Sequence, residues 1–178
     1  MNYKQPITVW ITGLPASGKT TLGKALQNRI SQLRIPVVLL DGDEIRRGLC
    51  SDLGFTPTDR TENIRRVSSI AALLNSQGVV SICCFVSPRR SMREMARTII
   101  GQKSFFEVYT DAPVEVCQSR DIKGNYSKAI NGRLQNFTGI SDSYEAPMNP
   151  NLHLNTAELS ESEAVDILFD HFVRWVDK

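Results

Sequence analysis

The 178-residue sequence has few cysteines and no long apolar run. Its four cysteines, Cys50, Cys83, Cys84 and Cys117, show no C-x-x-C spacing, which favours buried thiols over a zinc site or a disulfide framework. No stretch approaches the roughly 20 apolar residues of a membrane-spanning helix, and the first residues lack the apolar centre of a signal peptide. We therefore expect a reduced, cytoplasmic protein with no membrane attachment.

The chain also has little excess charge. Lys and Arg number 21 against 19 for Asp and Glu, a net charge of +2, which does not predict a nucleic-acid-binding protein. A guanidinium can hold a phosphate or sulfate with two parallel hydrogen bonds, so clustered arginine suits a small polyanion, although a solvated basic helix face is the alternative. Nine arginines crowd the middle of the chain: Arg46, Arg47, Arg60, Arg65, Arg66, Arg89, Arg90, Arg93 and Arg97.

Hydrophobic residues make up 41% of the chain, enough for one core, so we expect a single domain over residues 1–178. Apolar, β-branched runs predict strands at residues 7–12, 37–40, 79–86, 105–109 and 152–154. Helical spacing predicts helices from about residue 19, at 59–77, 89–100 and 114–120, and a last one after 160, with Thr58 and Ser160 as caps. This alternation predicts an α/β fold, a five-stranded parallel sheet covered by helices on both faces.

Residues of about 121–149 differ from the rest, because they mix Lys, Gly, Asn, Ser and Pro with few apolar side chains. We interpret this segment as a mobile lid with one short helix near Tyr126–Asn131.

A phosphate-binding motif, G-x-x-x-x-G-K-[ST], directly follows the first predicted strand and opens the first predicted helix. Amides of such a loop point at a β-phosphate, Lys19 would reach the β- and γ-phosphates, and the Thr20 hydroxyl would join a magnesium shell. The nucleotide-binding residues expected here are Gly13, Leu14, Pro15, Ala16, Ser17, Gly18, Lys19, Thr20 and Thr21. No N-K-x-D motif is present, which argues against a GTPase.

Acidic residues follow the second predicted strand, at the sheet edge where parallel α/β proteins bind ligands. A carboxylate of Asp41 or Asp43 could accept a hydroxyl proton or hold water on magnesium, and Arg46 could fix an anionic acceptor. The alternative is an aspartate that only caps a helix beside a surface arginine. The sequence does not decide which aspartate lies nearer the metal.

Six further blocks, in order along the chain, carry a family resemblance. The blocks are residues 53–66, 85–88, 105–108, 111–113, 120–124 and 136–140. With the phosphate loop, they make the sequence from about Val9 to Asn155 closely resemble the adenylylsulfate kinase (APS kinase) family of P-loop kinases. The resemblance implies a three-layer fold like that of nucleoside monophosphate kinases. It also implies transfer of the γ-phosphate of ATP, with Mg²⁺, to the 3′-hydroxyl of adenosine 5′-phosphosulfate, giving 3′-phosphoadenosine 5′-phosphosulfate and ADP.

The same resemblance implies residue roles. Asp43 resembles the carboxylate near the acceptor hydroxyl, and Lys19, Asp43 and Ser87 are the catalytic candidates. The implied acceptor-binding residues are Asp43, Arg46, Phe55, Arg60, Asn63, Val86, Ser87, Lys123 and Phe137, with Arg46 and Arg60 on the phosphosulfate and the two phenylalanines around the adenine. Arg120 is similar to a residue that reaches the donor nucleotide. Because Phe137 lies in a polar segment, we expect it to bind ligand rather than to pack in a core.

Three questions stay open. Ser87 could carry a phosphoserine intermediate, but direct transfer asks less of the protein, and we expect a binding role. Glu44, Thr61 and Arg89 depart from the family pattern, which leaves room for a same-fold kinase of another nucleotide-linked or small anionic alcohol. A catalytically inactive nucleotide-binding regulatory module is the other alternative, and a homodimer is a further expectation.

Overall fold

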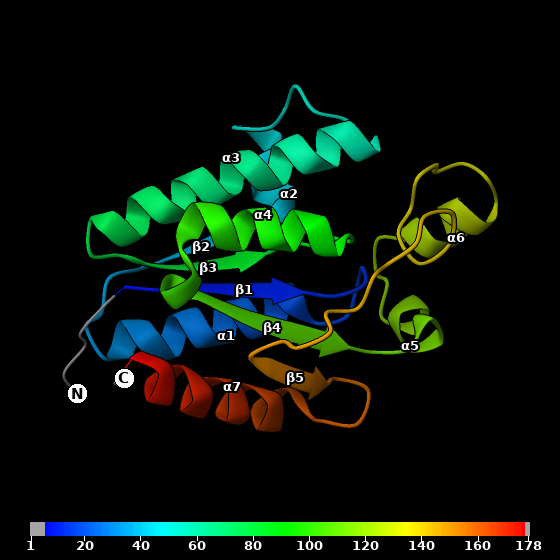
Figure 1. The fold of residues 1–178 in the computed structure, drawn as a ribbon. Coiled ribbons are helices and arrows are strands. Elements are labelled where there is room, and N and C mark those ends of the chain that lie inside the picture. Colours follow the sequence, from blue (N-terminus) through cyan, green and yellow to red (C-terminus); the bar gives the residue numbers. More distant parts are fainter. Residues whose placement is uncertain (1–5, 177–178) are drawn as a thin grey trace.

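A parallel five-stranded sheet between two helical layers organises residues 6–176, the part of the chain that the computed structural model describes (Figure 1). The strands lie in the order β2-β3-β1-β4-β5, which confirms the predicted α/β class. Their bounds are β1 (Thr8–Thr12), β2 (Val37–Asp41), β3 (Val80–Cys84), β4 (Phe105–Asp111) and β5 (Leu152–Asn155). The helices are α1 (Lys19–Gln32), α2 (Gly42–Arg47), α3 (Pro57–Ser76), α4 (Arg90–Ile100), α5 (Val114–Ser119), α6 (Asn125–Ile130) and α7 (Glu161–Val176), with a 3₁₀ turn at Gln102–Ser104.

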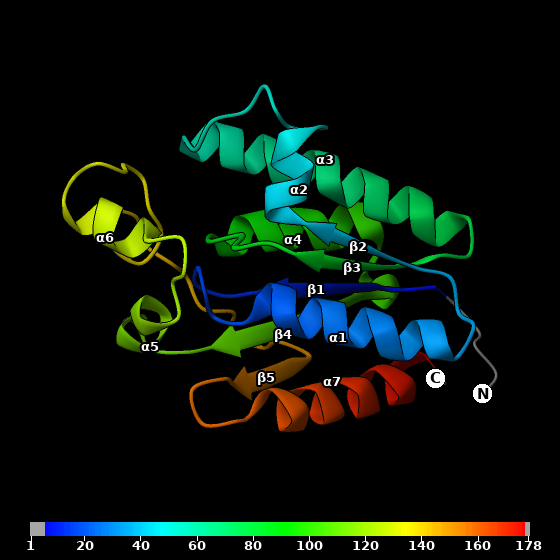
Figure 2. The same cartoon turned by 180° about the vertical axis from the view of Figure 1, so that it is seen from behind.

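Helices cover both faces of the sheet. On one face α1 and α7 pack over a core that includes Leu26 and Phe172, and on the other α3 and α4 pack over Trp10 and Phe105 (Figures 1 and 2). Every residue of β1 and β3 is buried. This explains their unbroken apolar and β-branched sequences, since strands with two covered faces need no polar alternation.

Helix α3 begins two residues earlier than the sequence predicts, and its cap is Thr56 rather than Thr58. The Thr56 hydroxyl accepts from the Asp59 amide at 3.2 Å, and the Asp59 carboxylate accepts from the Thr56 amide and hydroxyl. Pro57 occupies the first helical position, where its missing N–H costs nothing. This reciprocal capping box fixes the direction in which α3 leaves the cleft edge.

The lid segment folds partly as predicted. Its short helix α6 stands away from the sheet (Figure 1), on a small apolar cluster that includes Ala112, Cys117, Tyr126 and Phe137. Beyond this cluster the chain returns along the start of α4, where the Glu145 amide donates to the Pro88 carbonyl at 2.8 Å. Residues 142–146, called the returning arm below, are therefore fastened to the body of the protein.

All four cysteines are buried and free, which confirms their interpretation as structural thiols. No helix within residues 6–176 is both long and apolar enough to cross a membrane. The first and last described residues, Pro6 and Val176, lie near the amino ends of the strands (Figures 1 and 2). The phosphate loop lies at the opposite, carboxyl ends of the strands.

Candidate active site

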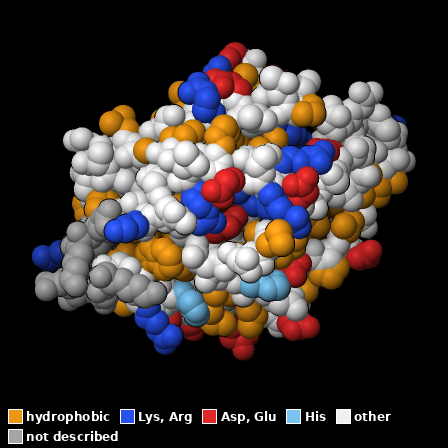
Figure 3. All heavy atoms as spheres, viewed as in Figure 1, with side chains coloured by type: hydrophobic (Ala, Val, Ile, Leu, Met, Phe, Trp, Pro, Cys, Tyr) orange, Lys and Arg blue, Asp and Glu red, His pale blue; other side chains and the backbone are white. Residues whose placement is uncertain are grey.

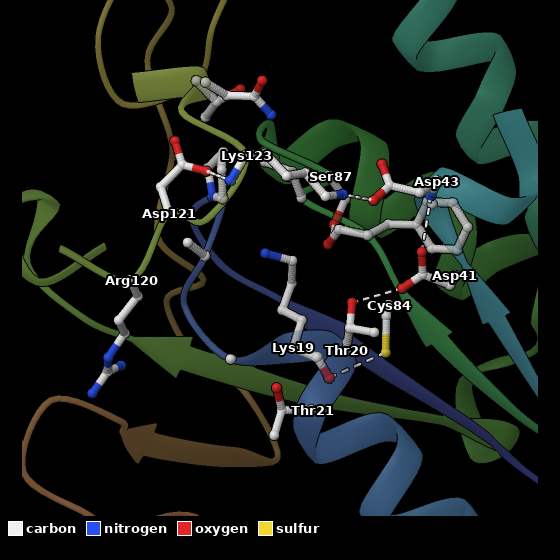
Figure 4. Close-up of a pocket in the computed structure, with 18 of the residues that line it drawn as sticks. Lys19, Thr20, Thr21, Asp41, Asp43, Cys84, Ser87, Arg120, Asp121 and Lys123 are labelled. Carbon is white, nitrogen blue, oxygen red and sulfur yellow. Dashed lines mark hydrogen bonds and ion pairs between the residues drawn. The ribbon is translucent and has the colours of Figure 1, made fainter. Parts of the chain in front are cut away.

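A cleft of about 1050 Å³ opens at the carboxyl ends of β1, β2 and β3. The phosphate loop, which follows β1, forms its floor, the start of α2 and α3 forms one wall, and the lid segment forms the other. These three segments lie far apart in the sequence, and the sheet order brings them together because β2 and β1 flank β3. The geometry places most of the predicted nucleotide-binding residues and all of the predicted acceptor-binding residues around one space, part of which Figure 4 shows.

The phosphate loop is shaped by close approach to β4. A Cβ added to Gly13 would lie 2.3 Å from the Thr110 hydroxyl, so only glycine fits there. The Ser17 hydroxyl hydrogen-bonds the same Thr110 at 2.7 Å and is fully buried, and Gly18 at φ 93° turns the chain into α1. Gly13, Leu14 and Ser17 thus face the protein, whereas Pro15, Ala16, Gly18, Lys19, Thr20 and Thr21 line the cleft.

Lys19 is the buried cation of the loop. Its ammonium donates to the carbonyls of Gly13 at 3.0 Å and Leu14 at 2.6 Å, and the residue is only 8% exposed. Burial lowers the pKa of Lys19 from 10.5 to about 8, although nearby carboxylates oppose the shift. At neutral pH the side chain is therefore still protonated and can bind phosphate.

Thr20 and Asp41 form a pair of oxygen groups that fits Mg²⁺, since hydroxyl and carboxylate oxygens suit this ion. The Thr20 hydroxyl donates to Asp41 Oδ2 at 2.6 Å beside Lys19 (Figure 4). The other oxygen of Asp41 accepts from the Asp43 amide at 2.9 Å and caps the short helix α2. Asp41 therefore caps a helix, as one of the two interpretations of the sequence proposed, and it also faces the phosphate loop.

Asp43 lies across the cleft and forms an ion pair with Lys123 of the lid segment (Figure 4). Both side chains are more than half exposed, at 62% and 58%. The two aspartates thus separate. Asp41 belongs to the phosphate-loop side of the cleft, and Asp43 faces the lid segment.

An arginine pair holds an exposed ring beside Asp43. The Arg46 guanidinium lies 4.3 Å from the centroid of Phe55, and that of Arg60 lies 5.6 Å from it. Burial lowers the pKa of both arginines, but arginine stays charged at neutral pH. Arg60 also donates to the Asn136 carbonyl of the lid segment. Two cations and an aromatic face, 51% exposed on Phe55, are therefore available at one wall.

The far end of that wall is buried. Asn63 is 4% exposed, and its side-chain oxygen has no hydrogen-bond partner among residues 6–176. Phe137 is 8% exposed and packs edge-on against Tyr126, with ring centroids 4.9 Å apart. Our expectation that Phe137 avoids core burial is wrong, because its polar neighbours in sequence are not its neighbours in space. It still contributes to the lining of the cleft, as do Asn63 and Val86.

Ser87 directs its hydroxyl inward. Trp10 Nε1 donates to that oxygen at 3.1 Å, the hydroxyl lies 3.0 Å from the Thr12 hydroxyl, and Ser87 is 3% exposed. The residue also has a left-handed backbone, φ 37°, which is costly for a residue other than glycine. The backbone of Ser87 thus reaches the cleft while its hydroxyl supports the sheet.

Arg120 belongs to the cleft lining, but its guanidinium points away from Lys19 and Asp43 (Figure 4). It donates to the Thr156 carbonyl at 2.8 Å. The Thr156 hydroxyl in turn donates to the Ser17 carbonyl at 3.0 Å, which links the loop after β5 to the phosphate loop. Nothing in the sequence around Thr156 signals this role, because a lone threonine in a loop has no distinctive pattern.

The arginine cluster divides into two groups. Arg46, Arg47 and Arg60 line the cleft. The other six interact with carboxylates or carbonyls elsewhere: Arg65 and Arg66 with Glu62 and Asp52, Arg89 and Arg90 with the returning arm, and Arg93 and Arg97 with Glu107. The cluster as a whole is therefore not one polyanion site, since carboxylates of the same helices and of distant segments neutralise most of it.

Comparisons with known proteins show the family of the chain. The family model for adenylylsulphate kinase matches residues 5–155. The adenylyl-sulfate kinase of Paraburkholderia xenovorans is 46% identical over 173 residues, which cover 97% of this chain and 96% of that protein.

Solved structures give the same likeness. The Mycobacterium tuberculosis APS kinase CysC, solved in complex with AMPPNP and APS, superposes with a TM-score of 0.91 at 38% identity, covering 95% of this chain and 98% of that one. A hexameric APS kinase from Thiobacillus denitrificans superposes with a TM-score of 0.74 at 28% identity, over 97% of this chain and 29% of that one.

Proposed function

The chain belongs to the adenylylsulphate kinase family, and we propose that the residues of its cleft divide the work of that family's reaction between a donor side and an acceptor side. In this reaction the γ-phosphoryl group of ATP moves to the 3′-hydroxyl of adenosine 5′-phosphosulfate. The products are 3′-phosphoadenosine 5′-phosphosulfate and ADP, which amounts to sulfate activation.

On the donor side, the loop amides and Lys19 bind the phosphates of ATP. The ammonium of Lys19 already lies against two loop carbonyls, so the charge is held in place before nucleotide binds. The positive end of α1 adds to the attraction. Thr20 and Asp41 would hold Mg²⁺, whose oxygen-ligand preference they fit. The metal supplies neutralisation of the charge on the phosphates.

On the acceptor side, Asp43 is the group that orients the 3′-hydroxyl and takes its proton on a carboxylate oxygen. Arg46 and Arg60 bind the phosphosulfate, and the exposed ring of Phe55 is available to stack on the adenine. The lid segment contributes Lys123 and, at its base, Phe137. Closure of this segment over both nucleotides excludes water, which would otherwise compete as phosphoryl acceptor.

The ion pair of Asp43 with Lys123 carries the proposal, because it connects the wall that holds the arginines with the lid across the cleft. We test it with Asp43→Asn in an assay that couples ADP release to acceptor. The parent should turn over adenylyl sulfate, and the variant should lose at least 100-fold in kcat with little change in the KM for ATP, since general-base catalysis is worth about 10²–10⁴-fold.

Glu44→Gln is the matched control, because Glu44 is the next carboxylate on α2 and pairs with exposed Arg47. It should keep near-parental turnover. Equal activity of Asp43→Asn and the parent would show that Asp43 does not take the proton of the acceptor hydroxyl.

The same assay separates the rival functions. A same-fold kinase of another anionic alcohol would release ADP faster with sugars or other nucleotide derivatives than with adenylyl sulfate. An inactive regulatory module would bind ATP and release no ADP with any acceptor.

We also infer a cytoplasmic location, which the four free, buried cysteines support. Fractionation of cells that express the chain would test this. Self-association, as in the relative described as hexameric, is a further proposal, with the homodimer as the expected state. Light scattering on the protein as it elutes from a size-exclusion column measures its oligomeric state directly.

A further inference from the structure

A buried arginine outside the cleft connects the lid to the acceptor wall, which comprises the start of α2 and α3 and the Val86–Ser87 backbone that follows β3. Arg93 of α4 is 3% exposed, so its guanidinium depends on protein atoms for hydrogen-bond partners. Three of its nitrogens have partners. Nε pairs with Glu107 at 3.0 Å, one terminal nitrogen donates to the Ser87 carbonyl at 2.7 Å, and the other donates to the Glu145 carbonyl at 2.6 Å.

Glu107 makes this burial tolerable. Its side chain is 6% exposed and accepts from Arg93 and, at 2.8 Å, from Arg97. A buried charge without a partner costs several kcal/mol, so the carboxylate of β4 is what allows a cation to lie here. Lys and Arg side chains alternate with Asp and Glu across the middle of this face (Figure 3), in keeping with a network rather than a free basic patch.

The two carbonyls that Arg93 holds belong to different functional parts. Ser87 follows β3, carries the left-handed backbone at φ 37°, and contributes to the acceptor wall. Glu145 belongs to the returning arm, by which the lid segment rejoins the sheet. One planar guanidinium, with donors fixed in a fork, therefore sets the spacing between them.

A second pair of hydrogen bonds connects the same parts of the structure. The hydroxyl of Tyr144, on the returning arm, lies 3.0 Å from that of Thr12, the last residue of β1. Thr12 also donates to the Val86 carbonyl at 2.8 Å. These contacts join the end of β1, which leads into the phosphate loop, to the Val86–Ser87 backbone and to the arm, and neither Thr12 nor Tyr144 lines the cleft.

We propose that Arg93, neutralised by Glu107, is a positioning residue that fixes the Ser87 backbone of the acceptor wall to the returning arm of the lid. It touches no reacting atom. It acts through the Ser87 and Glu145 carbonyls, and its effect on kinetics rests on the proposed function. The hinge of the lid consequently lies before residue 142, and the lid is shorter than the predicted 121–149.

The test uses the paired variant Arg93→Met with Glu107→Gln, which removes the network without leaving a buried charge unpaired, and the milder Arg93→Lys. Amide hydrogen exchange without substrates should become at least tenfold faster at Glu145, whose amide donates to the Pro88 carbonyl. In the kinetic arm, the KM for adenylyl sulfate should rise about tenfold while the KM for ATP changes less than threefold. Arg93→Lys keeps the charge but cannot span both carbonyls, so it should fold and show the same KM split.

Arg97→Met is the matched control. It removes the other ion pair of Glu107 but touches neither Ser87 nor Glu145, so it should lower the melting temperature and leave the exchange at Glu145 and the KM ratio unchanged. Parental exchange at Glu145 in Arg93→Lys would overturn the proposal, as would equal rises in both KM values. If exchange at Glu145 is faster in the Arg93 variants but the parent protein lacks acceptor-dependent turnover, the tie between Ser87 and the returning arm is retained and the proposed function is refuted.

Discussion

Asp41 and Asp43 are two positions apart, yet they face different halves of the cleft. The reason is the start of α2 between them. Asp41 ends β2 and caps the helix, so its free oxygen turns toward Thr20, whereas Asp43 lies in the first turn and points across the cleft to Lys123. A sequence pattern cannot separate them, because both follow the same strand. The directions of the two side chains can be told apart only when the position of the α2 axis is known.

At the same scale, Lys19 predicts a pH dependence. Burial lowers the pKa of its ammonium to about 8, so the charge that binds ATP is present below pH 8 and is lost as pH rises through that value. We expect kcat/KM for ATP to fall above pH 8, approaching tenfold per pH unit, because this ratio reports groups of the free enzyme.

The measurement is a rate profile from about pH 6.5 to 9.5. Lys19→Arg keeps its charge over the whole range and should show a flat profile, whatever its absolute rate. A parent profile that stays level to the alkaline end would contradict the assignment.

Ser87 predicts a different outcome for transfer chemistry. Because its hydroxyl is engaged by Trp10 and Thr12, we expect Ser87→Ala to keep turnover within about tenfold of the parent and to lose about 1–3 kcal/mol of unfolding free energy, since Trp10 Nε1 is left unpartnered. Radiolabelled γ-phosphate should leave no acid-stable label on the parent protein.

Ser68→Ala serves as the comparison, because Ser68 is a buried hydroxyl of α3 remote from the cleft lining. Loss of turnover in Ser87→Ala together with phosphate on Ser87 would establish the phosphoserine intermediate instead.

At the scale of elements, the start of α3 predicts which threonine matters. Thr56→Ala removes the capping box and should cost about 1 kcal/mol of unfolding free energy. Thr58→Ala, the exposed position that the sequence pattern favours as the cap, should change it by less than about 0.5 kcal/mol. Urea denaturation of both variants measures the difference. Equal losses would mean that the helix begins where the pattern placed it.

The elements also show what a sequence can and cannot predict here. The spacing of apolar residues predicts the strands and the long helices, so β1 and α1 can be located from the sequence alone. Helix α2 is missed because it has only six residues, opens on Gly42 and buries no side chain. The loop motif identifies Lys19 and Thr20 by spacing, whereas the Arg93 network joins residues 52 positions apart and leaves no local pattern.

The burial of Phe137 has the same cause. Its cluster is assembled from α5, α6 and the lid segment, and a polar local sequence hides contacts that only the fold creates.

At the scale of the whole molecule, the buried thiols predict that labelling requires unfolding. Burial raises the pKa of Cys83, Cys84 and Cys117 and shields all four sulfurs. A thiol reagent should therefore modify almost none of them within minutes in the folded protein and all four in denaturant. ATP should slow the labelling further, because it binds only the folded state.

Ser143→Cys adds an exposed thiol on the returning arm and should react at once, which confirms that the reagent is active. Prompt modification of the parent would show that the core opens more readily than its packing implies.

The described ends of the chain, Pro6 and Val176, lie on the side of the molecule where the strands begin, away from the phosphate loop. An affinity tag, a reporter or a surface linker attached at either terminus would thus leave the entrance for both nucleotides unobstructed. The protein could be immobilised with every molecule presenting its substrate entrance to the bulk solution, and its turnover compared in that orientation with turnover in free solution.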